Sequence, residues 1–145
     1  MIKLMDTLLK EINLDFRFTC YSALACSKRD GIMDFVEDST TIQDVIAETN
    51  RDVRVFLMNQ SEDKSKQAET MNNYLLSNAG YAVATYLLAI GDRHLENLLV
   101  KNNGEMFHLD FGFILGNNPK SKGDFWVPPI RINKPMVLGM GGMGS

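Results

Sequence analysis

The sequence predicts an α+β fold that is mostly helical and contains one clear β-hairpin. Apolar residues recur at steps of three and four over Gln67–Ile90, which indicates a long buried helix. Asn103-Gly104 separates two five-residue runs, Leu98–Asn102 and Glu105–Leu109, and Asn-Gly is the strongest two-residue hairpin signal. The chain has 145 residues, of which 45% are hydrophobic, so it can bury a real core within a single domain.

The N-terminal segment is predicted to contain a helix followed by a strand. Apolar residues at helical spacing predict an amphipathic helix over residues 2–12. Phe16, Phe18 and Cys20 alternate with polar or charged neighbours, which predicts a strand over Asp15–Tyr21.

Two shorter strands are expected next, over Leu24–Ser27 and Ile32–Val36. Arg29-Asp30-Gly31 lies between them and has the composition of a turn. These runs therefore predict a second, smaller antiparallel pair.

The segment between residues 40 and 66 is expected to hold two short helices and a loop. Thr40 or Thr41 is placed to cap a helix that runs through Glu48. A second short helix is expected within Arg51–Leu57, and Ser61–Lys66 has the composition of a solvated loop.

The long helix over Gln67–Ile90 is expected to serve mainly as core. Its small residues allow another element to approach closely: Ala79, Gly80, Ala82 and Ala84. Gly91 is placed to end the helix and to deliver Asp92 directly into the following loop.

The hairpin is expected to bring Asn97 and Asp110 together at its open end. Counting outward from a two-residue turn, Asn102 pairs with Glu105, and Asn97 faces Asp110. Directly opposed residues of an antiparallel ladder lie about 4.5–5.5 Å apart and share a face. An amide oxygen and a carboxylate at that distance suit one hard cation such as Mg²⁺.

The motifs around these two residues match the chemistry of phosphoryl transfer. Asp92 precedes Asn97 by five residues, as the catalytic-loop Asp precedes the metal-binding Asn in protein kinases. Asp110 begins an Asp-Phe-Gly triplet, whose Asp holds Mg²⁺ in those enzymes. However, His94 follows Asp92 by two residues, whereas the protein-kinase His precedes its Asp.

The order Asp-Arg-His-x-x-Asn is typical of phosphoinositide 3- and 4-kinases and of the large protein kinases related to them. The chain resembles this family most in GDRHLENLL at Gly91–Leu99 and FHLDFGFILG at Phe107–Gly116. Within it the chain is most similar to class III phosphatidylinositol 3-kinases, whose pattern reads GDRHLDNLL and FHIDFGYILGRDPKP. The resemblance extends to Pro128-Pro129 and to GMGG at residues 139–142. Departures include Glu96 for Asp, Cys20 for Pro and an insertion around Ser121–Trp126.

The resemblance implies a partial protein-kinase-like fold of the phosphatidylinositol 3- and 4-kinase type. Residues 1–38 would be the end of the N-lobe and the hinge, and residues 39–145 the C-lobe. The catalytic loop would span residues 91–98 and the activation loop residues 110–135. The family's glycine-rich phosphate loop, its strand Lys and its C-terminal helices have no counterpart in this sequence, so these residues alone are expected to show negligible kinase activity.

The resemblance also implies the site residues and the cofactors, ATP with Mg²⁺ or Mn²⁺. Asp92, His94, Asn97 and Asp110 would be catalytic, and Asn97 and Asp110 would hold the metal. Asp92 and His94 both remain candidates for accepting the hydroxyl proton, because a neutral imidazole suits that task near pH 7 and Asp92 can instead orient it. Arg93 is expected to be a structural ion-pair partner, and His108 is expected to be structural.

The adenine pocket is expected at the hinge. By resemblance, backbone groups of Asp34 and Val36 would bind the base, with Met33 and Phe35 lining the pocket. Ile114, after the Asp-Phe-Gly triplet, would add an apolar wall.

A lipid substrate is expected on the activation loop. The net charge of −3 argues against a nucleic-acid partner, yet basic residues gather in one segment that suits an anionic lipid headgroup: Lys120, Lys122, Arg131 and Lys134. Their scattered placement beside Phe125-Trp126 favours phosphatidylinositol, which carries only its diester phosphate, and these two aromatic side chains suit the bilayer interface. The resemblance implies a cytoplasmic enzyme, peripheral on endosomal and autophagic membranes, with a regulatory pseudokinase subunit.

Three interpretations follow from the sequence. The first is the catalytic core of a class III-like phosphatidylinositol 3-kinase. The second is a phosphatidylinositol 4-kinase or a related protein kinase, and the third is a non-catalytic kinase-fold module that serves as a binding surface. Gly91 and Leu95 favour the first over the 4-kinase pattern KDRHNGNIM, and the presence of both Asn97 and Asp110 disfavours the third.

Overall fold

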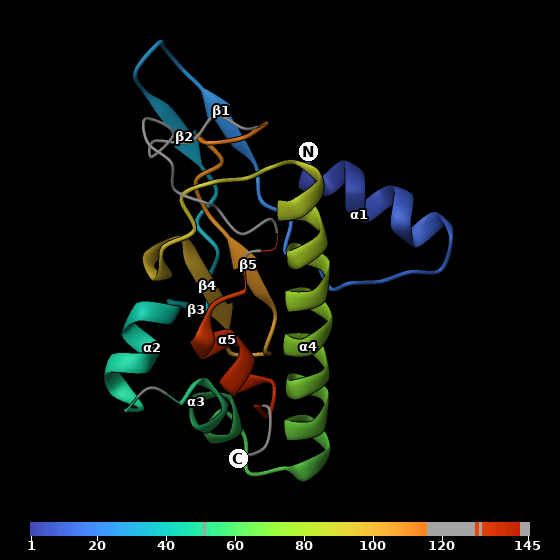
Figure 1. The fold of residues 1–145 in the computed structure, drawn as a ribbon, viewed down its shortest axis with the longest axis vertical. Helices are drawn as coiled ribbons and strands as arrows, with labels where there is room; N and C mark the ends of the chain where they lie inside the picture. Colours follow the sequence, from blue (N-terminus) through green and yellow to red (C-terminus); the bar gives the residue numbers. More distant parts are fainter. Residues whose placement is uncertain (51, 116–129, 131, 143–145) are drawn as a thin grey trace.

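The chain forms a mixed helical and antiparallel sheet structure around one long helix (Figure 1). The computed structural model describes residues 1–50, 52–115, 130 and 132–142. The elements in chain order are α1 (Ile2–Glu11), β1 (Ala23–Ala25), β2 (Gly31–Met33), β3 (Ser39–Thr41), α2 (Ile42–Glu48), α3 (Val53–Asn59), α4 (Lys64–Leu87), the 3₁₀ helix η1 (Leu95–Asn97), β4 (Leu98–Lys101), β5 (Met106–His108) and α5 (Lys134–Gly139). The predicted α+β composition is confirmed in the described residues.

The strands form two separate antiparallel sheets in the described part of the chain. The β1–β2 pair is the predicted small hairpin, with Leu24 opposite Ile32. The other sheet has the order β3-β4-β5. Strand β3, which the sequence does not predict, pairs with β4 of the predicted hairpin. Figure 1 shows β1 and β2 extending away from the rest of the molecule, while β3, β4 and β5 lie beside α4.

The register of the β4–β5 hairpin differs by one residue from the predicted register. Leu98 lies opposite His108, and the Lys101 N–H donates to the Glu105 carbonyl over 2.9 Å. The connection therefore has three residues rather than two, and within it only Gly104 has a positive φ, of 90°. A three-residue loop that ends in a left-handed residue is the next most common hairpin connection after the two-residue turns.

Short polar side chains cap the N-termini of α2, α3 and α4. The Thr41 side chain accepts a hydrogen bond from the Asp44 N–H, which confirms the predicted start of α2. Asp52 caps α3 in the same way, and Asp63 accepts from the Ser65 N–H at the start of α4. The predicted loop over Ser61–Lys66 is therefore wrong after residue 63, because its own aspartate starts the helix.

Helix α4 ends earlier than predicted, and Gly91 does not end it. The helix stops at Leu87, and Ala89 takes the left-handed conformation with a φ of 45°. The Ile90 N–H then donates to the Thr85 carbonyl over 3.0 Å, which satisfies one of the last carbonyls of the helix. Ala89 thus occupies the position that glycine usually takes.

The predicted strand over Asp15–Tyr21 is wrong, since this segment forms no strand in the structure. Arg17 has a φ of 54°, which interrupts extended backbone, and Phe16 and Phe18 lie against α4 instead. A Cβ atom on Gly80 would lie 2.8 Å from Phe16 Cβ and Phe18 Cζ. The small residue in α4 therefore permits the close approach that the sequence predicts.

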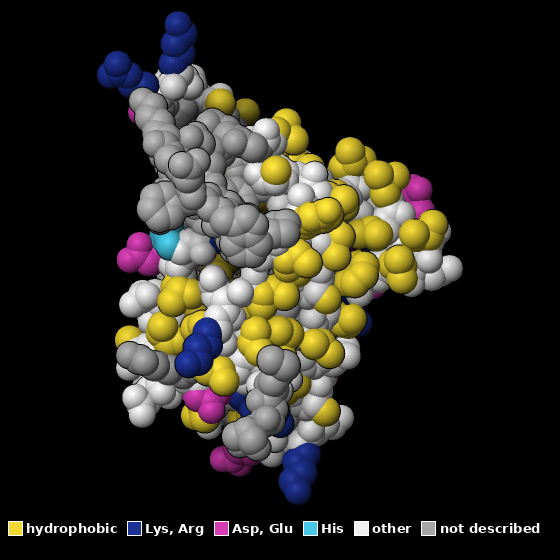
Figure 2. Space-filling model, in the orientation of Figure 1, with side chains coloured by type: hydrophobic (Ala, Val, Ile, Leu, Met, Phe, Trp, Pro, Cys, Tyr) yellow, Lys and Arg dark blue, Asp and Glu magenta, His cyan; other side chains and the backbone are white. Residues whose placement is uncertain are grey.

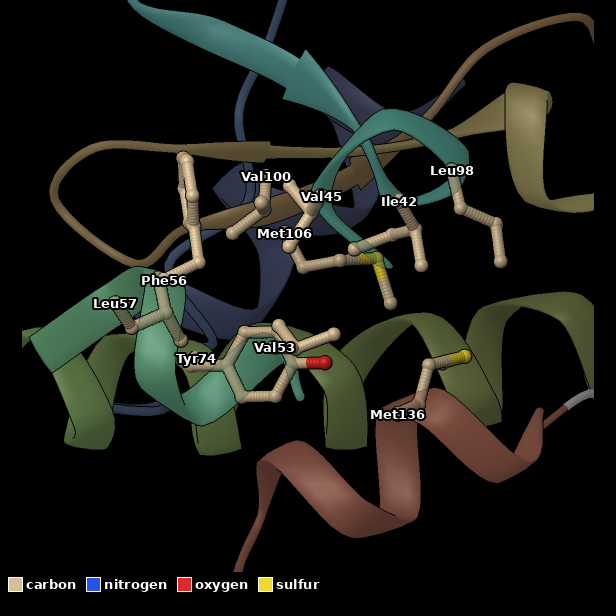
Figure 3. Close-up of a cluster of buried hydrophobic side chains, with 10 residues drawn as sticks. All are labelled: Ile42, Val45, Val53, Phe56, Leu57, Tyr74, Leu98, Val100, Met106 and Met136. Atoms are coloured by element: carbon tan, nitrogen blue, oxygen red, sulfur yellow. The ribbon is translucent and has the colours of Figure 1, made fainter. Parts of the chain in front are cut away.

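Two hydrophobic clusters hold these elements together. The larger cluster joins α2, α3, α4 and the hairpin, as Figure 3 shows. Its buried members are Ile42, Val45, Val53, Phe56, Leu57, Tyr74, Leu98, Val100, Met106 and Met136. The smaller cluster contains Ile2, Phe18, Tyr81, Ala84 and Phe107, and it fixes α1 and the segment after it.

Polar contacts then fix the position of the hairpin on α4. The Asn73 side-chain amide donates to the Asn103 carbonyl over 3.0 Å, and the Met106 N–H donates to Ser77 Oγ over 2.9 Å. These bonds link the turn and β5 directly to the helix. Helix α4 leads into the loop over residues 91–97, and β5 leads into Asp110. These bonds between helix and hairpin therefore fix the two segments that carry the predicted site residues relative to each other.

Apolar side chains also cover part of the outer surface. Figure 2 shows them gathered over α1 and the adjoining face of α4, where Leu8, Val83 and Leu87 border a groove of about 250 Å³. In the described ranges, no helix is both long enough and apolar enough to cross a membrane.

Candidate active site

The loop that follows α4 holds the first half of the candidate site. Asp92 is partly buried and has a φ of 51°, so the backbone turns sharply at this residue. The Asn97 side-chain amide donates from Nδ2 to the Asp92 carbonyl over 3.0 Å. This bond closes the loop and turns Asn97 Oδ1 away from the Asp92 carbonyl.

The Asp-Phe-Gly segment after β5 holds the second half. The Leu109 N–H donates to the Asn97 carbonyl over 2.9 Å, so Asn97 lies opposite Leu109 rather than opposite Asp110 as predicted. The cause is the extra residue in the hairpin turn. However, Asn97 lies in η1 and Asp110 has a φ of 53°, so the strict alternation of strand side chains applies to neither residue.

Asp110 is held by its own turn. Its Oδ1 accepts a hydrogen bond from the Gly112 N–H over 2.9 Å, and an added Cβ on Gly112 would lie 3.0 Å from this oxygen. The structure thus brings Asp92, Asn97 and Asp110 to the same end of the hairpin, next to the end of α4.

His94 lies on the exposed side of the same loop. Its Nδ1 is 3.7 Å from Glu96 Oε2, and its side chain is 47% exposed. A contact at Nδ1 leaves Nε2 directed away from Glu96, because the two nitrogens lie on different sides of the ring. Glu96 is one of the departures from the class III pattern, and the structure gives it this contact.

Arg93 is predicted to be a structural ion-pair partner, and the hydrogen bonds of its side chain to described residues go to backbone carbonyls. Its Nε donates to the Gly91 carbonyl over 2.7 Å, and Nη1 donates to the Leu109 carbonyl over 2.6 Å. Nη2 donates to the Asp110 carbonyl. The sequence pattern contains no signal for this arrangement.

His108 is fully buried against Tyr81 of the smaller cluster, as its predicted structural role requires. Its ring stacks on Tyr81 with 4.3 Å between centroids, and neither ring nitrogen has a hydrogen-bond partner among the described residues. Burial, together with the smaller effect of the nearby Arg93 charge, lowers the pKa of His108 to about 3. The imidazole is therefore neutral in the folded protein at physiological pH.

This burial makes stability depend on pH. Because the unfolded chain takes up a proton below its ordinary pKa of about 6.5 and the folded chain does not, stability is lost as the pH falls through 6.5. From pH 7 to pH 5 the loss attributable to His108 is about 2 kcal/mol. Thermal unfolding of the full-length protein and of His108→Phe at both pH values measures it. We expect Tm to fall less in the variant, and an equal fall in both would contradict the assignment.

A cavity beside the predicted hinge contains four of the five predicted adenine-pocket residues. The cavity has a volume of about 160 Å³ and is lined by Met33, Asp34, Phe35, Val36, Ser39, Leu99, Phe107 and Leu109. Ile114 is not among these described lining residues. Leu99 and Phe107 were missed, although they form a cross-strand pair of the hairpin and so share one face.

The backbone of the predicted hinge already makes other hydrogen bonds. The Asp34 N–H donates to the Ser22 carbonyl over 2.9 Å, so only the Asp34 carbonyl is left for a base. The Asp34 carboxylate accepts from the Ser22 N–H over 2.8 Å, which fixes this residue against the start of β1.

The predicted headgroup residues are mostly outside the described residues. Lys120, Lys122 and Arg131 lie there, as do Phe125 and Trp126. Lys134 is described, and it is the exposed first residue of α5. The preceding residue, Asn133, donates from Nδ2 to the Arg93 carbonyl over 3.4 Å, which ties the start of α5 to the candidate site.

The donor set suits a hard cation. In the described residues there is no cluster of three or more His, Cys, Asp or Glu side chains that would hold a metal by itself. Asn97 and Asp110 instead offer one amide and one carboxylate, and Mg²⁺ typically takes one or two protein oxygens and completes its shell with phosphates and waters. The residues therefore fit a cation that arrives with a nucleotide.

Comparison with known proteins gives a consistent result. The family model for "Phosphatidylinositol 3- and 4-kinase" matches residues 1–145. The chain is 42% identical over 149 residues to the nodule isoform of phosphatidylinositol 3-kinase from Glycine max. It is 40% identical to phosphatidylinositol 3-kinase pik3 of Schizosaccharomyces pombe and to phosphatidylinositol 3-kinase VPS34 of Arabidopsis thaliana. These matches cover at least 99% of the chain but only 18% of each relative.

Proposed function

The chain belongs to the phosphatidylinositol 3- and 4-kinase family, and we propose that it forms the metal-binding and catalytic part of a phosphatidylinositol 3-kinase. The observation that carries this proposal is the convergence of Asp92, Asn97 and Asp110 at one end of the hairpin, beside His94. Residues 91–98 would then form the catalytic loop within a partial kinase domain of which residues 1–38 form the hinge side.

Asn97 and Asp110 would hold the divalent cation. When bound, Mg²⁺ or Mn²⁺ would neutralise the phosphate charge of ATP during transfer. The Asp92 carbonyl fixes the Asn97 amide, and the Gly112 N–H fixes one carboxylate oxygen of Asp110. Both ligands are thus held in position before a cation arrives, which lowers the cost of ordering them.

The hinge cavity would receive adenine. Its lining is mostly apolar, and Val36, Leu99, Phe107 and Leu109 offer apolar contact surface to a purine. Adenine presents both a donor and an acceptor on one edge, and the Asp34 carbonyl and the Val36 N–H are the complementary backbone groups.

His94 and Asp92 both remain candidates for accepting the proton of the attacking hydroxyl. His94 is the more exposed of the two and so is open to a substrate that approaches from solution. Both residues contact Asn97 through their backbone, because the Asp92 carbonyl accepts from the Asn97 side-chain amide and the His94 carbonyl accepts from the Asn97 N–H, each over 3.0 Å.

The substrate would be the inositol ring of phosphatidylinositol, phosphorylated at the 3-position. The three relatives named above support this, and their names all specify phosphatidylinositol 3-kinase. A peripheral place on endosomal and autophagic membranes and a pseudokinase regulatory subunit belong to the same proposal, with Lys134 and the other basic residues as headgroup contacts.

The test uses the full-length protein with phosphatidylinositol vesicles, ATP and Mg²⁺. We expect a singly phosphorylated lipid with the new phosphate at position 3. A product phosphorylated at position 4 would indicate the 4-kinase alternative. An inactive protein that still binds ATP would indicate the non-catalytic alternative.

A further inference from the structure

Arg93 connects three parts of the candidate site through one side chain. Its guanidinium donates to the carbonyl of Gly91 in the loop after α4, and to the carbonyls of Leu109 and Asp110 at the end of the hairpin. Only 9% of the residue is exposed, so these bonds are shielded from water. A planar guanidinium can donate in several fixed directions at once, which the single nitrogen of a lysine cannot do.

The bond to Asp110 falls at a residue whose backbone is left-handed. Asp110 has a φ of 53°, a conformation that non-glycine residues adopt uncommonly and at some cost in energy. Its carbonyl is held by Arg93, and its carboxylate is held by the Gly112 N–H. The direction of the carboxylate therefore depends on a backbone that Arg93 anchors.

Other contacts surround the same junction. The Gly91 N–H donates to the Phe113 carbonyl over 2.7 Å, and the Leu115 N–H donates to the Leu88 carbonyl over 2.8 Å. The Arg93 guanidinium also lies 5.8 Å from the centre of the Phe111 ring. The Arg93 guanidinium carries a charge, which strengthens each of its bonds to a carbonyl.

We infer that Arg93 is a positioning residue that locks the Asp110 backbone to the catalytic loop and so sets the direction of the Asp110 carboxylate. It touches neither substrate nor metal in this role. Its effect on catalysis rests on the proposed function, whereas its effect on the backbone does not.

Hydrogen–deuterium exchange of the full-length protein tests the backbone effect. Arg93→Lys keeps the positive charge but removes the planar set of guanidinium N–H donors. We expect it to raise the backbone amide exchange rate about tenfold in residues 88–93 and 109–115. Exchange in the middle of α4 and in the hairpin turn should stay at the wild-type level. Arg54→Lys, the same change at an exposed position of α3, is the matched control and should leave all these segments unchanged.

A kinase assay with the same proteins tests the consequence. If the enzyme is active, we expect kcat of Arg93→Lys to fall about 100-fold with a much smaller change in KM for ATP, since misplaced groups act on the chemical step. Unchanged exchange at both segments would overturn the inference, and so would a uniform rise across α4 and the hairpin. A local rise in exchange in a protein whose wild type has no activity would support the inference and count against the proposed function alone.

Discussion

Asp110→Asn in the full-length protein is expected to lower phosphatidylinositol kinase activity roughly 1000-fold or more. The change removes the negative charge that would hold the cation, and it keeps the size of the side chain. Asparagine tolerates the left-handed backbone at this position and can still accept from the Gly112 N–H. We therefore expect Tm to stay close to the wild-type value, which thermal unfolding and a lipid kinase assay together measure.

Asp38→Asn is the matched control for this experiment. Asp38 also has a positive φ, of 53°, and it is exposed on the segment before β3. The same chemical change there should leave activity near the wild-type level. If Asp110→Asn retained most of its activity, the proposed metal site would be wrong.

Gly104→Ala is expected to have the largest effect on stability. An added Cβ would lie 2.0 Å from the Thr70 carbonyl oxygen, and the φ of 90° is itself unfavourable for any residue with a side chain. The obstacle is backbone of α4, which cannot rotate aside. We expect a loss of about 3 kcal/mol or more in unfolding free energy, seen as a marked drop in Tm, together with loss of activity.

Gly142→Ala is the control that measures the cost of the left-handed backbone without a steric clash. Gly142 also has a positive φ, of 69°, but its nearest atom to an added Cβ is Leu138 Cδ2 at 3.9 Å. This control should cost about 1 kcal/mol, the typical cost of strain alone. If Gly104→Ala and Gly142→Ala lost equal unfolding free energy, the close contact between Gly104 and the Thr70 carbonyl would be contradicted.

The sequence predicts α1 to α4 to within a few residues because their signals are local, whereas α5 was not predicted. Thr41 and the apolar period of α4 are readable within one or two turns of the chain. The end of α4 was misplaced because Ala89, not Gly91, takes the left-handed position. Gly91 instead donates its N–H to the Phe113 carbonyl. Contacts of this kind join residues far apart in the sequence, so a local pattern does not show which residue takes the left-handed position.

The sequence predicts the wrong register for the candidate site. Asn97 and Asp110 were identified from their motifs, while their direct pairing was wrong by one residue of register. The error came from the turn, where Asn103-Gly104 permits both a two-residue and a three-residue connection. Packing of Gly104 on Thr70 favours the observed one, and no local pattern reveals that contact.

Arg93 shows a further limit of motif reasoning. Its neighbours Asp92 and His94 stand out because their side chains have familiar chemistry. The role of Arg93 depends on the carbonyls of Leu109 and Asp110, which every sequence contains. Only the folded backbone shows that these carbonyls converge on one guanidinium.

The most direct test of the account is to locate the cation in crystals of the full-length protein with a non-hydrolysable ATP analogue and Mn²⁺. An anomalous difference map identifies the metal without ambiguity. We predict one Mn²⁺ peak bound by both Asn97 Oδ1 and the Asp110 carboxylate, at about 2 Å from each oxygen. A metal bound to the nucleotide with both side chains turned away from it would contradict the account.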